Sequence, residues 1–505
     1  MLAVRPVRQN PGVASLGALE GESQPGQRPE VGPWPHGLPT EPWQMSAHEL
    51  AAALRRRELS AAEALRSVLA RADLVERRLN PFATRLDDRA RMAAAVADRA
   101  LRAGAGGPLC GVPVTIKDSQ RLAGVESTSG SLAKPPLVPD HTCASVELLE
   151  QAGAVVFATT ATPEFCYAGV TESRRHGRTL NPWNPDRTPG GSSGGAGAAV
   201  AAGAGPLSLG GDGGGSIRIP SAFCGLVGLK PSFGLVPREP CGPAWFSLVS
   251  NGPMARSVTD VRLMLGAVSA GEALDLRMPG LRGVRLVVSE TRGGTAPVDD
   301  DVLRLFRRAV ASLEAAGAEL VEDDPGLPSS VVTWAVIAAR DAWLAERETY
   351  QARADLLTAS TREMLEFGRD ITDEDVVAAE QHRPVVAAAY DALLDRHGAA
   401  ALLTPTVGCQ AFTHGRRYPD RIGATTIEPP WLDWAGFLYD ANLTGMPAIA
   451  LPCGLGDDRL PVSLQLISRR GSDGALLALA EAVEQVVGHC SWPDFPFNAS
   501  PDTIS

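Results

Sequence analysis

Apolar positions along the chain follow two alternating patterns. Short apolar runs, typical of buried strands, cover residues 112–116, 154–158, 284–288, 448–452 and 462–467. Between these runs apolar residues recur with helical spacing, most clearly in residues 143–151, 302–313 and 473–487. Strands that alternate with helices indicate layers packed around a largely buried sheet. We therefore predict an α/β fold in a single large domain.

Two sequence signals mark the start of helices near the N-terminus. Ser46 is followed by Glu49 and Ser60 by Glu63, the spacing at which serine and glutamate cap the first turn of a helix. Residues 1–45 are rich in proline and glycine and lack apolar periodicity. We expect a disordered or loosely packed extension there, followed by helices.

Charge and composition argue against several classes of protein. The 505 residues carry a formal net charge of −11, which disfavours a nucleic-acid surface. No apolar stretch reaches the roughly 18 residues of a membrane span, and the first residues lack the pattern of a secretory signal. The eight cysteines and eight histidines lack the spacings of metal sites or redox motifs. We expect a cytoplasmic protein with no nucleic-acid or membrane partner, no metal and no cofactor.

Lysine is rare in this chain. The 47 basic residues include lysine only at Lys117, Lys134 and Lys230. A buried lysine can lose its proton and act as a base, whereas arginine is effectively always charged. Lys117 ends an apolar run, and burial there would lower its pKa. Two interpretations of Lys117 stay open from the residues alone: a base, or a structural ion pair with Asp118 or another acid.

Glycine is concentrated between residues 190 and 216, where it occupies twelve of 27 positions. Such density marks backbone that bends tightly or approaches a ligand closely. Ser192 lies here in a GxSxG sequence, the nucleophile turn of α/β-hydrolases. That turn needs a preceding strand, which the three prolines of residues 181–189 exclude. A phosphate-binding loop is disfavoured too, because GK[ST] is absent. A closely packed Gly/Ala-rich turn is the structural alternative.

Ser216 ends this stretch, directly after three consecutive glycines. The glycine amides can point inward together and stabilise an oxyanion. A serine at the end of such a concavity is placed to attack a carbonyl carbon. Asp212 and Arg218 flank the concavity. A salt bridge between them would brace it, so we assign this pair to structural support.

These motifs resemble those of the amidase signature hydrolases. Three segments follow the family's order and spacing: GVPVTIKD (111–118), GGSSGG (190–195) and GGDGGGSIRIPSAFCGLVGLKPSFG (210–234). The similarity continues through GPMARSVTD, LLTPT and NLTGMPAIALPCG and covers roughly residues 46–490. The resemblance implies the amidase signature fold, in which helices cover both faces of a central mixed β-sheet.

The resemblance also implies the site residues. Lys117, Ser192 and Ser216 would form a Ser-cisSer-Lys triad, with a cis peptide before Ser192. Ser216 would be the acylated nucleophile, and Ser192 would pass its proton to neutral Lys117. The oxyanion and substrate-binding groups would be the amides of Gly213, Gly214, Gly215 and Ser216, with Ser193 as a hydrogen-bonding support.

The function implied is hydrolysis of a carboxylic amide, or a related carbamate or ester, through a serine acyl-enzyme. The partner would be a small-molecule amide or carbamate, and a homodimer is compatible with this function. Two alternatives stay open: the glutaminase subunit of a tRNA-dependent amidotransferase, and a catalytically inactive amidase-fold scaffold protein. The first usually carries glutamine where Ile219 stands. The intact triad disfavours the second.

Three positions depart from the family pattern. Gly211 stands where the family commonly has Thr or Ser, and Gly213 stands where it commonly has Thr or Ile. We expect these glycines to make the amide concavity more flexible. Arg121 stands near a position that is often aspartate, which changes the local hydrogen bonding.

The resemblance also suggests how the chain is organised. An amidase domain at residues 46–490 would lie between the extension at 1–45 and a C-terminal tail at 491–505. It would contain N-terminal helices at 46–100, the signature core at 109–260 and a variable, substrate-side region at 328–440. Aromatic residues of the last region either line an apolar acyl or aryl pocket or belong to the core: Trp334, Trp343, Tyr350, Phe367, Trp431, Trp434, Phe437 and Tyr439.

Overall fold

The computed structural model describes residues 41–239, 245–269, 274, 276–428, 432–490 and 492–493. Most of the expected extension, Cys241, Trp431 and nearly all of the expected C-terminal tail lie outside these residues. The expectation of an extension up to residue 45 is wrong for its last residues, because residues 42–44 form a short 3-10 helix (η1, Pro42–Gln44). Trp43 holds this segment in place, since its ring packs edge-on against Trp492 with the ring centroids 5.4 Å apart.

An eleven-stranded sheet forms the centre of the fold. In spatial order its strands are β1 (Phe82–Arg85), β3 (Val155–Thr160), β2 (Pro113–Lys117), β6 (Leu207–Asp212), β8 (Ser250–Ala255), β7 (Val227–Lys230), β14 (Ala448–Leu455), β15 (Pro461–Ile467), β11 (Ala401–Pro405), β9 (Arg285–Val288) and β10 (Glu319–Glu322). Strands β3, β2 and β6 are parallel, the pairs from β6 to β11 are antiparallel, and β11, β9 and β10 are parallel again. The sheet is therefore mixed, as predicted.

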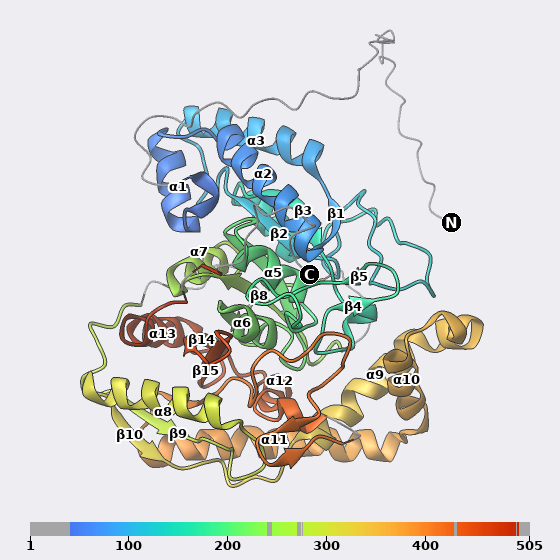
Figure 1. The fold of residues 1–505 in the computed structure, drawn as a ribbon, viewed down its shortest axis with the longest axis vertical. Helices are drawn as coiled ribbons and strands as arrows, with labels where there is room; N and C mark the ends of the chain where they lie inside the picture. Colours follow the sequence, from blue (N-terminus) through green and yellow to red (C-terminus); the bar gives the residue numbers. More distant parts are fainter. Residues whose placement is uncertain are drawn as a thin grey trace, which may run out of the picture. The chain divides into compact units, whose positions relative to one another are not determined.

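Helices flank this sheet. In chain order they are α1 (Ala47–Arg56), α2 (Ala61–Leu79), α3 (Asp87–Arg102), α4 (Ala144–Gln151), α5 (Gly194–Ala201), α6 (Arg218–Cys224), α7 (Val258–Val268), α8 (Asp300–Ala315), α9 (Val331–Arg353), α10 (Ala359–Asp370), α11 (Asp373–His397), α12 (Tyr439–Thr444) and α13 (Asp473–Val487). Figure 1 shows α1, α2 and α3 gathered near the β1–β3 end of the sheet, and α8 beside β9 and β10 at the other end. The predicted α/β fold is confirmed.

The helix starts predicted near the N-terminus are confirmed. The side chains of Ser46 and Ser60 accept hydrogen bonds from the backbone N–H groups of Glu49 and Glu63, and both glutamates complete a capping box. Helix α2 ends where Asn80 takes a left-handed conformation with φ of 50°. The apolar runs also form strands, with ends within a few residues of those expected.

The part of the fold that positions the site is a pair of neighbouring parallel strands. Strand β2 is buried along its whole length and ends at Lys117, and strand β6 ends at Asp212. The register pairs Ile116 with Leu209, so both strands end at the same edge of the sheet. In α/β folds this carboxyl edge is where ligands bind. The turns that lead into α5 and α6 meet this edge.

Helix α5 forms from the glycine- and alanine-rich segment after Ser193, which has no apolar periodicity. Every one of its residues is buried. A Cβ atom at Gly195 would lie 2.5 Å from the backbone oxygen of Pro81. Glycine is needed there because the helix packs directly against another backbone. Tertiary packing thus outweighs the low helix propensity of this sequence.

Candidate active site

Lys117 lies at the end of β2 with its ammonium group in a buried polar setting. Its side chain is 2% exposed, and Nζ donates to the Oγ of Ser192 at 2.7 Å and to the carbonyl oxygen of Gly211 at 3.1 Å. Asp118 does not pair with it, because its carboxylate accepts hydrogen bonds from the amides of Thr128 and Ser129. Lys117 has no salt bridge among the residues that the structure describes. The ion-pair interpretation is therefore wrong for this lysine.

The environment of Lys117 favours its neutral form. Burial lowers the pKa of Lys117 below the ordinary lysine value of 10.5, and this outweighs the opposing effects of Cys166 and Asp212. A lysine with a lowered pKa can accept a proton from a neighbouring hydroxyl group.

Ser192 and Ser193 occupy the turn before α5 and have different surroundings. The peptide bond between Gly191 and Ser192 is cis, as the resemblance implies. Ser193 is fully buried; its amide donates to the carbonyl oxygen of Ser216 at 3.1 Å, and its Oγ donates to the carbonyl oxygen of Gly211 at 3.3 Å. Ser193 therefore joins the turn to β6 and to the start of α6, and lines neither of the cavities described below.

Ser216 lies in the turn between β6 and α6. It is 7% exposed, and it borders both cavities described below. Within the described part of the chain, its Oγ makes no hydrogen bond. Among the three serines, Ser216 is the most exposed, and it shares the second cavity with Ser192 and Lys117.

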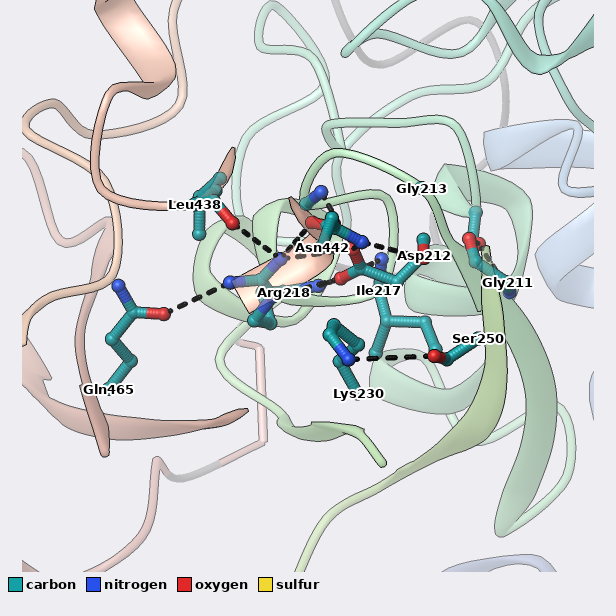
Figure 2. A network of polar contacts seen from close by, with 12 residues as sticks. Gly211, Asp212, Gly213, Ile217, Arg218, Lys230, Ser250, Leu438, Asn442 and Gln465 are labelled. Carbon is teal, nitrogen blue, oxygen red and sulfur yellow. Dashed lines mark hydrogen bonds and ion pairs between the residues drawn. The ribbon is translucent and has the colours of Figure 1, made fainter. Parts of the chain in front are cut away.

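A buried ion pair braces this turn. Asp212 and Arg218 are both fully buried, and the guanidinium Nε and Nη2 donate to the two carboxylate oxygens at 3.0 Å each. Figure 2 shows Arg218 between Asp212 and the polar groups of Leu438 and Gln465, to which it also donates. Burial alone would raise the pKa of Asp212, but the charge and hydrogen bonds of Arg218 hold it well below its usual value. The predicted salt bridge is confirmed.

The same carboxylate organises the backbone of the turn. Asp212 Oδ1 accepts the amide of Gly215 at 2.7 Å, and Oδ2 accepts the amide of Ile217 at 3.2 Å. The sequence-based expectation places the Gly215 amide in the oxyanion site, and the structure differs. The Gly215 amide already donates its hydrogen bond to the Asp212 carboxylate. The amides of Gly213, Gly214 and Ser216 therefore remain as candidates to bind an oxyanion.

Two indole rings close over the glycines of the turn. A Cβ atom at Gly213 would lie 2.6 Å from the ring of Trp245, and one at Gly214 would lie 2.5 Å from the ring of Trp334. Trp334 Nε1 also donates to the carbonyl oxygen of Gly213 at 2.7 Å. The space that a side chain would fill at Gly213 is therefore occupied by Trp245, and the turn is packed on this side rather than loosened. Gly211 instead faces Asn251.

Two cavities meet at Ser216, and their walls differ. The first has a volume of about 350 Å³ and an apolar wall that includes Ile219, Trp245, Trp334, Phe367 and Trp434. Its acidic residue, Glu363, is held in an ion pair by Arg417 at 2.5 Å. The second has a volume of about 240 Å³ and a more polar wall than the first, which includes Lys117 and Ser192.

The predicted aromatic residues divide between these walls and the rest of the fold. Trp334, Phe367, Trp434 and Tyr439 line the first cavity, whereas Trp343, Tyr350 and Phe437 line neither cavity. Further lining residues were not predicted from the sequence: Cys166, Tyr167, Trp245 and Met364. No local pattern marks them, because they come from loops and from a helix face that also packs in the core.

The two remaining lysines have distinct surroundings. Lys230 is fully buried near the ion pair of Asp212, and Figure 2 shows its Nζ next to Ser250. Nζ also donates to the carbonyl oxygen of Pro231 at 2.8 Å. Burial, followed by repulsion from Arg218, lowers the pKa of Lys230 to about 7. Lys134 is half-exposed and forms an ion pair with Glu346 at 2.6 Å, at the wall of the second cavity.

Among the described residues, no group of three or more His, Cys, Asp or Glu side chains is arranged to hold a metal ion. None of the helices that the structure describes is long and apolar enough to cross a membrane.

Comparisons with known proteins agree with this arrangement. The chain is 36% identical over 436 residues to "Putative amidase AmiB2" of Mycobacterium tuberculosis, covering 84% of this chain and 92% of that protein. It is 34% identical over 472 residues to a glutamyl-tRNA(Gln) amidotransferase subunit of Synechococcus sp., covering 86% and 94%. A solved bacterial aryl acylamidase of the amidase signature family superposes with a TM-score of 0.81 at 25% identity, covering 90% and 99%. A model of the Amidase family matches residues 63–477, so the chain belongs to the amidase family.

Proposed function

We propose that this chain hydrolyses the C–N bond of carboxylic amides, or the matching bond of a related carbamate or ester, through an acyl-enzyme on Ser216. One observation carries the proposal: the buried amine of Lys117 lies 2.7 Å from Ser192 Oγ, in the wall of a cavity that also reaches Ser216. A nucleophile, a relay and a base are thus gathered at one point.

The proposed reaction has two stages. Neutral Lys117 takes the proton of Ser192, which takes that of Ser216, and Ser216 Oγ attacks the carbonyl carbon. The amides of Gly213, Gly214 and Ser216 stabilise the resulting oxyanion. The proton then returns through Ser192 to the amide nitrogen, the C–N bond breaks, and the amine leaves. Water attacks the acyl-enzyme in the same way, which releases the acid and restores Ser216.

The first cavity favours an apolar acyl group over glutamine. Hydrolysis of glutamine would place a charged amino group and carboxylate on the acyl side, where Ile219, Trp334 and Phe367 offer no charge to pair with them. We therefore favour an aliphatic or aryl amide over the glutaminase reaction, and over the inactive scaffold.

We also propose a cytoplasmic location and a small-molecule partner. Seven cysteines in the described residues are free thiols, which is typical of a reducing compartment. Cavities of about 350 and 240 Å³ suit a small substrate. The homodimer stays a prediction.

A fluorophosphonate probe is expected to label Ser216. It mimics an acyl donor and reacts only with an activated serine, so labelling would be lost in Ser216→Ala and kept in a matched surface variant, Ser312→Ala. Mass spectrometry of the labelled peptide locates the adduct. Absence of label on folded protein would show the inactive scaffold instead, and a release assay over aliphatic, aryl, carbamate and glutamine substrates would rank the remaining activities.

The pH dependence of kcat/KM is expected to show a rise with pH. Only neutral Lys117 accepts the proton, so activity is low where Lys117 is protonated and reaches a plateau above its pKa. Because burial lowers this pKa, the midpoint should lie below the ordinary lysine value of 10.5. Initial rates with an amide that does not titrate test this. Activity that falls as the pH rises through this range would contradict the role of Lys117 as a base.

A further inference from the structure

If the proposed function holds, the path of the proton indicates which cavity binds the amine half of the substrate and which binds the acyl half. The departing nitrogen must take its proton from Ser192, so the amine half lies on the side of Ser192. Ser192 and Lys117 line the second cavity and are not part of the wall of the first, whereas Ser216 borders both. The second cavity therefore receives the amine and the first cavity the acyl group.

The second cavity carries an excess of positive charge. Apart from Lys117, whose neutral form is favoured, its wall contains the cationic residues Arg121, Lys134 and Arg238, and its acidic residue is Glu346. Glu346 is already paired with Lys134 at 2.6 Å. This leaves two guanidinium groups, in a chain whose formal net charge is −11.

Those two guanidinium groups have no carboxylate partner among the described residues. Arg121 makes no side-chain hydrogen bond or ion pair there. Arg238 donates only to the carbonyl oxygen of Phe246, at 3.0 Å. The nearby carboxylate of Asp118 is turned away, since it accepts the amides of Thr128 and Ser129. Both arginines are half-buried, and a guanidinium in such a position binds a carboxylate through paired hydrogen bonds.

The first cavity has the opposite character. Its wall is aromatic and aliphatic, and the carboxylate of Glu363 is paired with Arg417 at 2.5 Å. An apolar acyl group gains free energy from burial there, whereas a charged acyl group would lose its hydration without a partner. The charge difference between the two cavities therefore sets the orientation of the substrate.

We propose that the amine half of the substrate carries a carboxylate, and that the enzyme is selective for amino acids acylated on nitrogen by an apolar acid. The carboxylate pairs with Arg121 and Arg238 in the second cavity, and the acyl chain fills the first. Hydrolysis consumes one water, breaks the amide C–N bond and yields a carboxylic acid and a free amino acid. No oxidant, reductant or further reactant takes part.

Three conjugates of one acyl group test the proposal on the purified full chain. Phenylacetic acid is joined to glycine, which leaves an anion, to isobutylamine, a neutral group of similar shape, and to ethylenediamine, which leaves a cation. We expect kcat/KM for the glycine conjugate to exceed that of the isobutylamine conjugate about tenfold or more, because hydrogen bonds to charged groups are the stronger ones. The ethylenediamine conjugate should be the poorest.

Substitutions of Arg121 separate recognition from a structural role. In Arg121→Gln the ratio of kcat/KM for the glycine conjugate to that for the isobutylamine conjugate should fall about tenfold. In Arg121→Glu the preference should shift toward the ethylenediamine conjugate. The matched control, Arg369→Gln, removes an exposed arginine paired with its neighbour Asp370 and should leave the ratio unchanged. A purely structural Arg121 would lower all three rates together.

The outcomes distinguish this proposal from the proposed function. Equal rates for the three conjugates, or a ratio unaffected by Arg121→Glu, would overturn the charge selectivity while leaving the hydrolase intact. Labelling of Ser216 by the fluorophosphonate without cleavage of the glycine conjugate would also overturn it. Loss of both labelling and cleavage would refute the hydrolase itself.

Discussion

Replacing Lys117 with arginine is expected to abolish amide hydrolysis, with kcat reduced about a thousandfold or more. The charge is kept, but a guanidinium cannot release its proton and therefore cannot accept the proton of Ser192. Turnover of an amide under saturating conditions measures the loss. Near-normal turnover would refute the assignment of Lys117 as the base.

A rescue experiment separates loss of the base from misfolding. Lys117 lines the second cavity, so Lys117→Ala leaves space that a small amine can enter. Methylamine should restore part of the activity of Lys117→Ala as the pH approaches its pKa, which is close to the lysine value of about 10.4, and guanidine should not, because it stays protonated throughout this range. Equal rescue by both, or a lowered midpoint of unfolding that explains the loss, would point to a structural role instead.

Replacing Arg218 with methionine is expected to lower the free energy of unfolding by about 3–5 kcal/mol. Arg218 and Asp212 are both fully buried. Without the guanidinium, the Asp212 carboxylate keeps its backbone amides but loses its counter-charge, and an uncompensated buried charge is costly. Denaturant unfolding at pH 7 measures the shift, read from the midpoint at an unchanged slope.

An exposed ion pair provides the matched control for Arg218. Arg304 pairs with Asp457 at 2.9 Å, and their side chains are 52% and 89% exposed. Arg304→Met should therefore change the free energy of unfolding by about 1 kcal/mol or less. Equal effects of the two substitutions would contradict the view that burial makes the Asp212–Arg218 pair important.

Part of the fold was predictable from the sequence, where the signals of an element are local. A capping serine such as Ser60 and the glutamate that completes its capping box lie within a few residues of one another, and α2 begins directly after Ser60 as expected. Helix α5 was not predictable in this way. Its stability comes from contacts of Gly195 with a distant backbone, and no propensity records such contacts.

The candidate site was predictable in part, for the same reason. Lys117, Ser192 and Ser216 lie in short motifs whose residue types and order indicate their chemistry. The occupation of the Gly215 amide by Asp212 was not predictable, because it depends on the path of the turn after β6. The roles of Gly213 and Gly214 also needed the structure, since the indole rings that cover them come from elsewhere in the chain.

The sequence by itself determined the fold class, the helices and strands with strong local signals, and the lysine and serines that carry the proposed chemistry. Periodicity, capping and motif spacing are set by neighbouring residues, which is why they can be read along the chain. Only the tertiary structure decided which cavity is apolar and which is cationic. A cavity wall joins segments far apart in sequence, as the hydrogen bond of Trp334 to Gly213 across 121 positions shows. The charge around Ser216 is thus a property of the fold, because no single segment contains it.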